Sequence, residues 1–123
     1  MMLKVKLGIL MFIAALIFTG CSLSKTDVLE EFTSKEEGKY SMRIFSNSRD
    51  WEFEVNKVHN SEPGLLNYIE QVIIYSESDK LKSLKALGLE EKVPVILIFD
   101  TEKLVFHTND PEELRKFAKK LEK

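Results

Sequence analysis

The second half of the chain carries short apolar runs that predict two central strands and a hairpin. Residues 72–75 (VIIY) form a continuous, largely β-branched run, which is typical of a strand buried on both faces of a sheet. Residues 93–99 (VPVILIF) predict a second central strand that begins at a proline. Residues 100–103 (DTEK) indicate a turn and residues 104–107 (LVFH) a partner strand, so the last two strands form a hairpin.

Two amphipathic helices are predicted beside these strands. The first has Ser78 or Asp79 as its N-cap and Gly88 as its stop. Its apolar positions are spaced for one helical face: Leu81, Leu84 and Leu87. The last helix begins with Asp110 as its N-cap and Pro111 in its first position. Its apolar residues follow the i, i+3, i+4, i+7 rule: Leu114, Phe117, Ala118 and Leu121.

The first half of this region is harder to assign. Residues 40–45 (YSMRIF) predict a strand, and the Pro-Gly pair at 63–64 breaks the chain before a short helix over residues 65–69. Apolar and polar residues alternate over residues 51–56 (WEFEVN), which is a strand period. The same stretch, extended to Val58, also fits a helix, and the pattern leaves both open.

A separate apolar run lies near the start. Lys4 and Lys6 are the only charges before residues 7–18 (LGILMFIAALIF), which are uncharged. About a dozen apolar residues suit the h-region of a cleavable export signal, whereas a membrane-spanning helix needs about 20. The run therefore predicts a signal peptide over residues 1–20, with an uncleaved signal anchor as the less favoured alternative.

Residues 18–21 (FTGC) resemble the lipobox of bacterial lipoproteins, with phenylalanine where leucine is most common. The resemblance implies cleavage after Gly20, a diacylglycerol thioether on Cys21, and acylation of the new amino group, for example with palmitate. Two acyl chains anchor a protein stably, since each buried methylene contributes about 0.8 kcal/mol. We therefore expect a protein held by lipid on the extracytoplasmic face of the cell membrane; a buried, inert thiol is the alternative for Cys21.

Length and charge limit what the rest of the chain does. The 123 residues suffice for one domain. Because residues 22–39 are polar and charged, we expect residues 21–39 to be a lipidated, flexible tether, with a helical turn over residues 27–32, and residues 40–123 to be the folded domain. Without Lys4 and Lys6 the chain carries 16 basic and 20 acidic residues. This balance, with no basic stripe, argues against a nucleic-acid partner.

The stretch LKALGLEEKVPVILIFDTEKLV (residues 84–105) resembles the second half of the thioredoxin fold: a helix-end glycine, a Val-Pro segment and the hairpin after it. The resemblance implies an α/β fold, with a small mixed sheet flanked by helices and ending in a hairpin and a C-terminal helix. It makes residues 42–45 the preceding central strand and puts Pro94 where the family has a cis proline. A trans proline that starts a strand is the open alternative.

The chain departs from the family at the redox centre. The family's Cys-x-x-Cys would lie near residues 47–54, where this chain has NSRDW and no cysteine. Disulfide exchange needs a thiolate and a resolving thiol, so the family's activity is not expected here. Trp51 would then lie beside Pro94 and form with it a peptide-binding surface, unless Trp51 belongs to the core.

Other candidate chemistry is weaker. His59 and His107 have no cysteine to join them in a metal site and fit surface histidines better. Glu52 and Glu54 share a face only if their segment is a strand. The serines near Trp51 have no nearby base, and no phosphate, dinucleotide or calcium motif is present, so no cofactor is expected.

These observations favour a non-catalytic binding module of the cell envelope. Its partners would be the bilayer, through the diacylglycerol on Cys21, and an envelope protein or peptidoglycan. The alternatives are a small structural or peptidoglycan-associated lipoprotein, and a degenerate thioredoxin-like enzyme or redox accessory.

Overall fold

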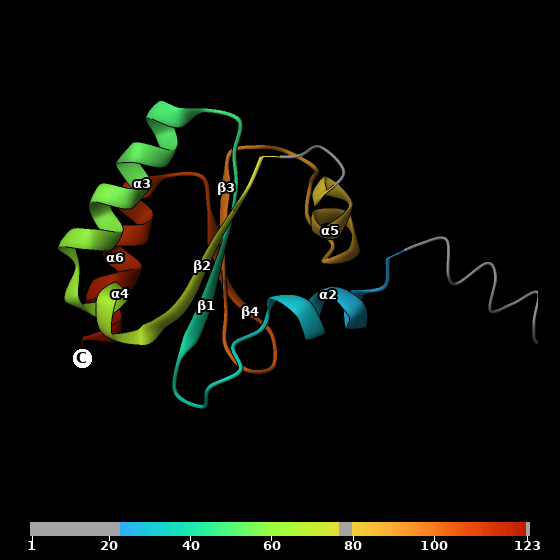
Figure 1. Cartoon of the computed structure of the whole chain (residues 1–123), viewed down its shortest axis with the longest axis horizontal. Helices are drawn as coiled ribbons and strands as arrows, with labels where there is room; N and C mark the ends of the chain where they lie inside the picture. The colour runs from blue at the N-terminus through green and yellow to red at the C-terminus, as the bar shows by residue number, and fades with distance from the viewer. Residues whose placement is uncertain (1–22, 77–79, 123) are drawn as a thin grey trace, which may run out of the picture.

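A four-stranded mixed sheet lies between two layers of helices (Figure 1). The computed structural model describes residues 23–76 and 80–122. The strands are β1 (Tyr40–Phe45), β2 (Ile69–Tyr75), β3 (Val95–Phe99) and β4 (Leu104–Thr108), in the order β2-β1-β3-β4. One face is covered by α3 (Arg49–Ser61), α4 (Pro63–Tyr68) and α6 (Pro111–Leu121), and the other by α2 (Lys25–Phe32) and α5 (Leu81–Ala86). The predicted α/β class, with flanking helices and a C-terminal helix, is confirmed. Residues 1–20 and Cys21 lie outside the described residues.

The core has one half on each side of the sheet. β1 is parallel to β2 and antiparallel to β3, which pairs antiparallel with β4. Side chains alternate between faces along a strand, so Met42 and Ile44 point toward α3 while Arg43 and Phe45 point toward α2. The larger half, on the α3 side, joins buried residues of β1, β3, α3, α4 and α6.

Strand β2 differs from the prediction for residues 72–75. It was expected to be buried on both faces, but it is an edge strand, and Val72 and Ile74 are 39% and 48% exposed. Their partners on β1, Met42 and Ile44, are fully or almost fully buried. The helices thus cover the centre of the sheet and leave its β2 edge partly open.

Residues 49–61 are a helix, which decides between the two alternatives that the pattern left open. Ser48 caps α3, and its Oγ accepts a hydrogen bond from the Trp51 amide at 3.4 Å. Val55 and Val58 are buried against the sheet. Glu52 and Glu54 therefore do not share a face, because residues two apart lie about 200° apart around a helix.

The segment expected to be a flexible tether contains α2, which is longer than the predicted helical turn. Val28 and Phe32 are fully buried on the sheet. The Phe32 ring lies 5.7 Å from the rings of Tyr75 and Phe99, measured between centroids. The packed part of the described chain therefore begins near Lys25 and not at Tyr40.

The hairpin and the last helix are confirmed. The Asp100 carboxylate accepts hydrogen bonds at 2.7 Å from the amides of Glu102 and Lys103, which fixes the turn. Asp110 caps α6 by accepting from the Glu112 amide at 2.9 Å. Both structures form through contacts within a few residues.

Helix α5 begins at Leu81, and Lys80 occupies the N-cap position without a side-chain hydrogen bond. Asp79 and Ser78, the predicted caps, lie outside the described residues. Leu84 is buried as predicted, and Gly88 follows the helix with φ +80°, a conformation that favours glycine.

Helices α4 and α6 cross at close range. Gly64 faces the backbone of Ala118, and a Cβ at this glycine would lie 2.2 Å from the Ala118 carbonyl oxygen. Beside this contact, Arg115 Nη1 donates to the nearly buried carboxylate of Glu62 at 2.8 Å. This hydrogen bond to Glu62 raises the pKa of Arg115 above its ordinary value.

Candidate functional site

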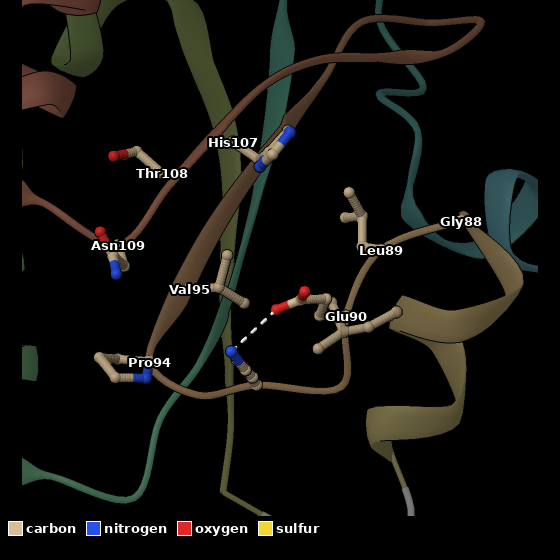
Figure 2. A pocket seen from close by; sticks show the side chains of 10 residues that line it. Gly88, Leu89, Glu90, Pro94, Val95, His107, Thr108 and Asn109 are labelled. Atoms are coloured by element: carbon tan, nitrogen blue, oxygen red, sulfur yellow. Dashed lines mark ion pairs between the residues drawn. The ribbon is translucent and has the colours of Figure 1, made fainter.

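A hollow of about 500 Å³ lies between the end of α5, the loop that leads into β3, and the end of β4 (Figure 2). Its apolar wall consists of Leu84, Leu89, Pro94 and Val95. Its polar lining consists of Glu90, Lys92, His107, Thr108 and Asn109, with Gly88 at the helix end. We call this the Pro94 hollow.

Pro94 is the residue that joins this hollow to the sheet. The Val93–Pro94 peptide bond is cis, which answers the question that the sequence left open. Pro94 is half-buried and lies directly before Val95, the first residue of β3. A proline at a strand start is compatible with the sheet because it needs no ladder donor there.

The two charged residues that line the hollow, Glu90 and Lys92, form an ion pair. Lys92 Nζ lies 3.1 Å from a carboxylate oxygen of Glu90, and this ion pair is well exposed. His107 projects from β4 and is exposed. Because Lys92 and Glu90 neutralise each other, the lining favours a ligand with apolar surface and a few hydrogen-bonding groups over a strongly charged one.

Trp51 does not line the Pro94 hollow. Its ring packs partly against the core of the α3 side. Its Nε1–H donates to the carbonyl oxygen of Asn109 at 2.9 Å, and Asn109 is one of the lining residues. Trp51 is thus connected to the hollow through Asn109, and its ring is half-buried: one part packs against the core and the other is exposed.

The head of α3 is held by local hydrogen bonds. The buried Ser46 Oγ donates to the Ser48 carbonyl oxygen at 3.1 Å and accepts from the Ser48 amide at 3.0 Å. Ser46 and Asn47 line a small hollow of about 90 Å³ that also touches Val93. The two serines therefore shape the loop and cap the helix, and no histidine or carboxylate of residues 23–76 and 80–122 forms a hydrogen bond with either hydroxyl.

The two histidines lie on different elements, and Glu52 and Glu54 lie on different sides of α3. His59 lies on α3, where its Nδ1 is 3.4 Å from the Asn60 side chain, while His107 lies on β4. Glu54 forms an exposed ion pair with Lys57 at 3.6 Å. Among residues 23–76 and 80–122 there is no group of three or more metal-ligating side chains.

A further hollow, which sequence reasoning missed, runs between α3 and β2. It has a volume of about 200 Å³. Met42, Ile44, Val72 and Ile74 form its apolar part, and Glu52, Asn56, His59 and Asn60 of α3 form its polar part. It was missed because the apolar β2 run reads as a fully buried strand; only the place of β2 at the sheet edge leaves it open.

Sequence reasoning also missed Arg43, a buried charge in the central strand. Arg43 is 2% exposed, and its Nη2 donates to the Glu31 carbonyl oxygen and to Gln71 Oε1, both at 2.9 Å. Its guanidinium carbon lies 5.3 Å from the centre of the Phe32 ring. Its Nε and Nη1 have no protein partner within the described part of the chain. The carbonyl oxygen and the aromatic ring, both from α2, stabilise a charge that is costly to bury.

Within the ranges that the structure describes, no helix combines the length and apolar character needed to cross a bilayer. Comparisons with protein-family models and with curated protein sequences find no match to this chain.

Proposed function

We propose that the mature protein is a lipid-anchored binding module on the extracytoplasmic face of the membrane, with a thioredoxin-like fold that does not exchange disulfides. The fold assignment is supported by the strand order β2-β1-β3-β4, the parallel β1–β2 pair, and a cis proline directly before β3. Of these features, the resemblance over residues 84–105 implies a small mixed sheet and a cis proline at position 94.

That the domain does not exchange disulfides through a pair of its own thiols follows from composition. Cys21 is the single cysteine of the chain, so no pair of thiols exists to form and resolve a mixed disulfide. At the head of α3, Ser46 and Ser48 are engaged in capping and loop hydrogen bonds. A thiol-reductase assay on the purified protein is expected to show no activity above a buffer control.

The Pro94 hollow is the observation that carries the binding proposal. It has an apolar wall, a balanced Glu90–Lys92 pair and hydrogen-bonding groups on β4. Strand β4 is the other edge of the sheet and pairs only with β3 in the described residues. An extended segment of an envelope protein fits this combination, because it can add to a free strand edge while its side chains enter the adjoining hollow.

Crosslinking tests this site directly. A photo-reactive amino acid replaces His107 in the hollow and, as a matched control, the exposed Lys119 on α6. We expect one discrete protein adduct in intact cells from the His107 position and none from Lys119. Adducts of equal yield at both positions, or co-sedimentation of the protein with purified cell wall and no protein adduct, would contradict a protein-binding hollow.

The anchor is supported by the leader and by the lipobox resemblance around Cys21. Its test is the intact mass of the membrane form, compared with the Cys21→Ala variant. We expect the wild-type mass to correspond to a chain that begins at Cys21 and carries diacylglycerol, and the variant to lose that mass and the membrane association. A soluble wild-type product without lipid would rule the anchor out.

A further inference from the structure

We infer that the α2–α5 side of the domain lies directly against the bilayer and that the α3–α6 layer faces away from it. This orientation rests on the proposed acylation of Cys21. It replaces the picture of a domain that stands off the membrane on a long tether.

The first step is the reach of the chain. Leu23 is the first described residue, two positions after Cys21. Consecutive residues span at most about 3.6 Å, so the α-carbons of Cys21 and Leu23 lie within about 7 Å of each other in any conformation. A lipid on Cys21 therefore keeps Leu23 at the membrane surface.

The second step is that the chain is attached to the folded domain almost immediately after Leu23. Ser24 caps α2: its Oγ accepts from the Asp27 amide at 3.1 Å, and its carbonyl oxygen accepts from the Val28 amide at 3.2 Å. One and two turns later, Val28 and Phe32 are fully buried.

An eight-residue helix is marginal in water by itself, so its packing on the sheet is what holds it. Arg43 strengthens this attachment, because its guanidinium bonds to the Glu31 carbonyl oxygen and lies over the Phe32 ring. Anchor and domain are therefore separated by too few residues for the domain to turn freely about its lipid.

The third step is which surface this leaves nearest the bilayer. Figure 1 shows the chain entering α2 on the side of the molecule away from α3, α4 and α6, with α5 beside α2. Lys80, at the N-cap of α5, and Glu31 of α2 form an ion pair at 3.6 Å, and buried residues of both helices share one half of the core. The two helices thus present a common surface.

The character of that surface allows contact with lipid headgroups. Leu23 is 44% exposed and lies where it can enter the apolar edge of the interface. The exposed lysines of the two helices, Lys25, Lys82 and Lys85, are largely offset by Asp27 and Glu30 on α2. Because these charges nearly balance, the short connection to Cys21, and not electrostatic attraction, sets the orientation.

The orientation puts the two hollows at different distances from the bilayer: the Pro94 hollow, which Leu84 and Leu89 line on the α5 side, lies on the membrane-proximal layer, within reach of a membrane-bound envelope protein. The hollow between α3 and β2, with the exposed side chains of Val72 and Ile74, lies on the layer that faces away from the bilayer. A soluble partner reaches this hollow without displacing the domain from the membrane.

Depth-dependent quenching tests the orientation on the full acylated protein. Lys85→Cys on α5 and Lys119→Cys on α6 each receive a fluorescent label; because Cys21 carries a thioether, only the introduced thiol reacts. The proteins are placed in vesicles of phosphatidylethanolamine and phosphatidylglycerol with a quencher on the headgroups. We expect several-fold stronger quenching at the Lys85 position than at Lys119.

A linker insertion is the matched control. About 20 Gly and Ser residues between Ser22 and Leu23 give an average span of about 25 Å, and the two positions should then be quenched nearly equally. Equal quenching without the insertion, in protein whose mass shows an acylated Cys21, overturns the orientation and leaves the anchor standing. A mass without lipid overturns the anchor itself, so the two failures are distinguishable.

Discussion

Replacing Phe32 with alanine tests whether α2 is part of the folded domain. Phe32 is fully buried, with ring centroids 5.7 Å from Tyr75 and Phe99 and 6.1 Å from Phe45. Its ring also covers the guanidinium of Arg43 at 5.3 Å. The substitution removes all these contacts from one half of the core.

The size of the effect follows from opposing contributions. Truncating a buried phenylalanine to alanine costs about 3–5 kcal/mol, and losing a desolvated cation–π contact adds about 0.5–2 kcal/mol. Against this, water gains access to Nε and Nη1 of Arg43, which have no partner among the described residues, and this recovers about 1–3 kcal/mol. We expect Phe32→Ala to lower the free energy of unfolding by about 3 kcal/mol.

Urea unfolding of the domain that begins at Ser22 measures this loss. With an m-value of about 1.5 kcal/mol/M, the midpoint should fall by about 2 M. The control is Glu30→Ala, an exposed position on the same helix, which should change the free energy of unfolding by less than about 0.5 kcal/mol. If both variants unfold at the wild-type midpoint, α2 contributes nothing to the domain, and residues 21–39 behave as the flexible tether that their composition suggests.

Three further substitutions test local features by thermal unfolding monitored by circular dichroism. Gly64→Ala should cost about 1–3 kcal/mol or more, because the new Cβ meets the Ala118 carbonyl oxygen at 2.2 Å and forces α4 and α6 apart; an unchanged midpoint would show that the helices do not pack this closely. Trp51→Phe should cost about 1 kcal/mol through the lost hydrogen bond to Asn109, and a wild-type stability would mean that this bond is not formed. Asp110→Ala should cost about 1 kcal/mol and Asp110→Asn much less, since asparagine also caps helices; equal losses in the two variants would contradict a capping role.

The hairpin and the last helix were predictable because their determinants are local. The turn after β3 is fixed by the Asp100 carboxylate and two amides within three residues of it. Helix α6 is fixed by the Asp110 cap, Pro111 and a regular apolar spacing. Such signals act over one or two turns of chain, so the sequence contains them in full.

The head of α3 and the Pro94 hollow were only partly predictable. The position of Pro94 beside the site was expected from the resemblance, but the partners of Trp51 were not, because Asn109 is 58 residues away in the chain. The alternation over residues 51–56 satisfied a strand and a helix equally. Burial of Val55 and Val58 against a sheet assembled from distant segments decided for the helix.

The misjudged elements share one physical cause. An apolar run such as that of β2 shows that burial is favourable, but the order of the strands decides how much burial is available, and β2 lies at an edge. Helix α2 has only a few apolar residues in a polar segment, yet Val28 and Phe32 find complete burial because the sheet leaves room for them beside α5.

By itself, the sequence determined the α/β class, the hairpin, the C-terminal helix, and the single cysteine that excludes a disulfide within the chain. Local spacing and composition suffice for these properties. The tertiary structure decided which strand lies at the edge of the sheet, whether residues 49–61 form a helix or a strand, and where the folded domain begins. Those outcomes depend on contacts between segments far apart in the chain, so they cannot be predicted from a local sequence pattern.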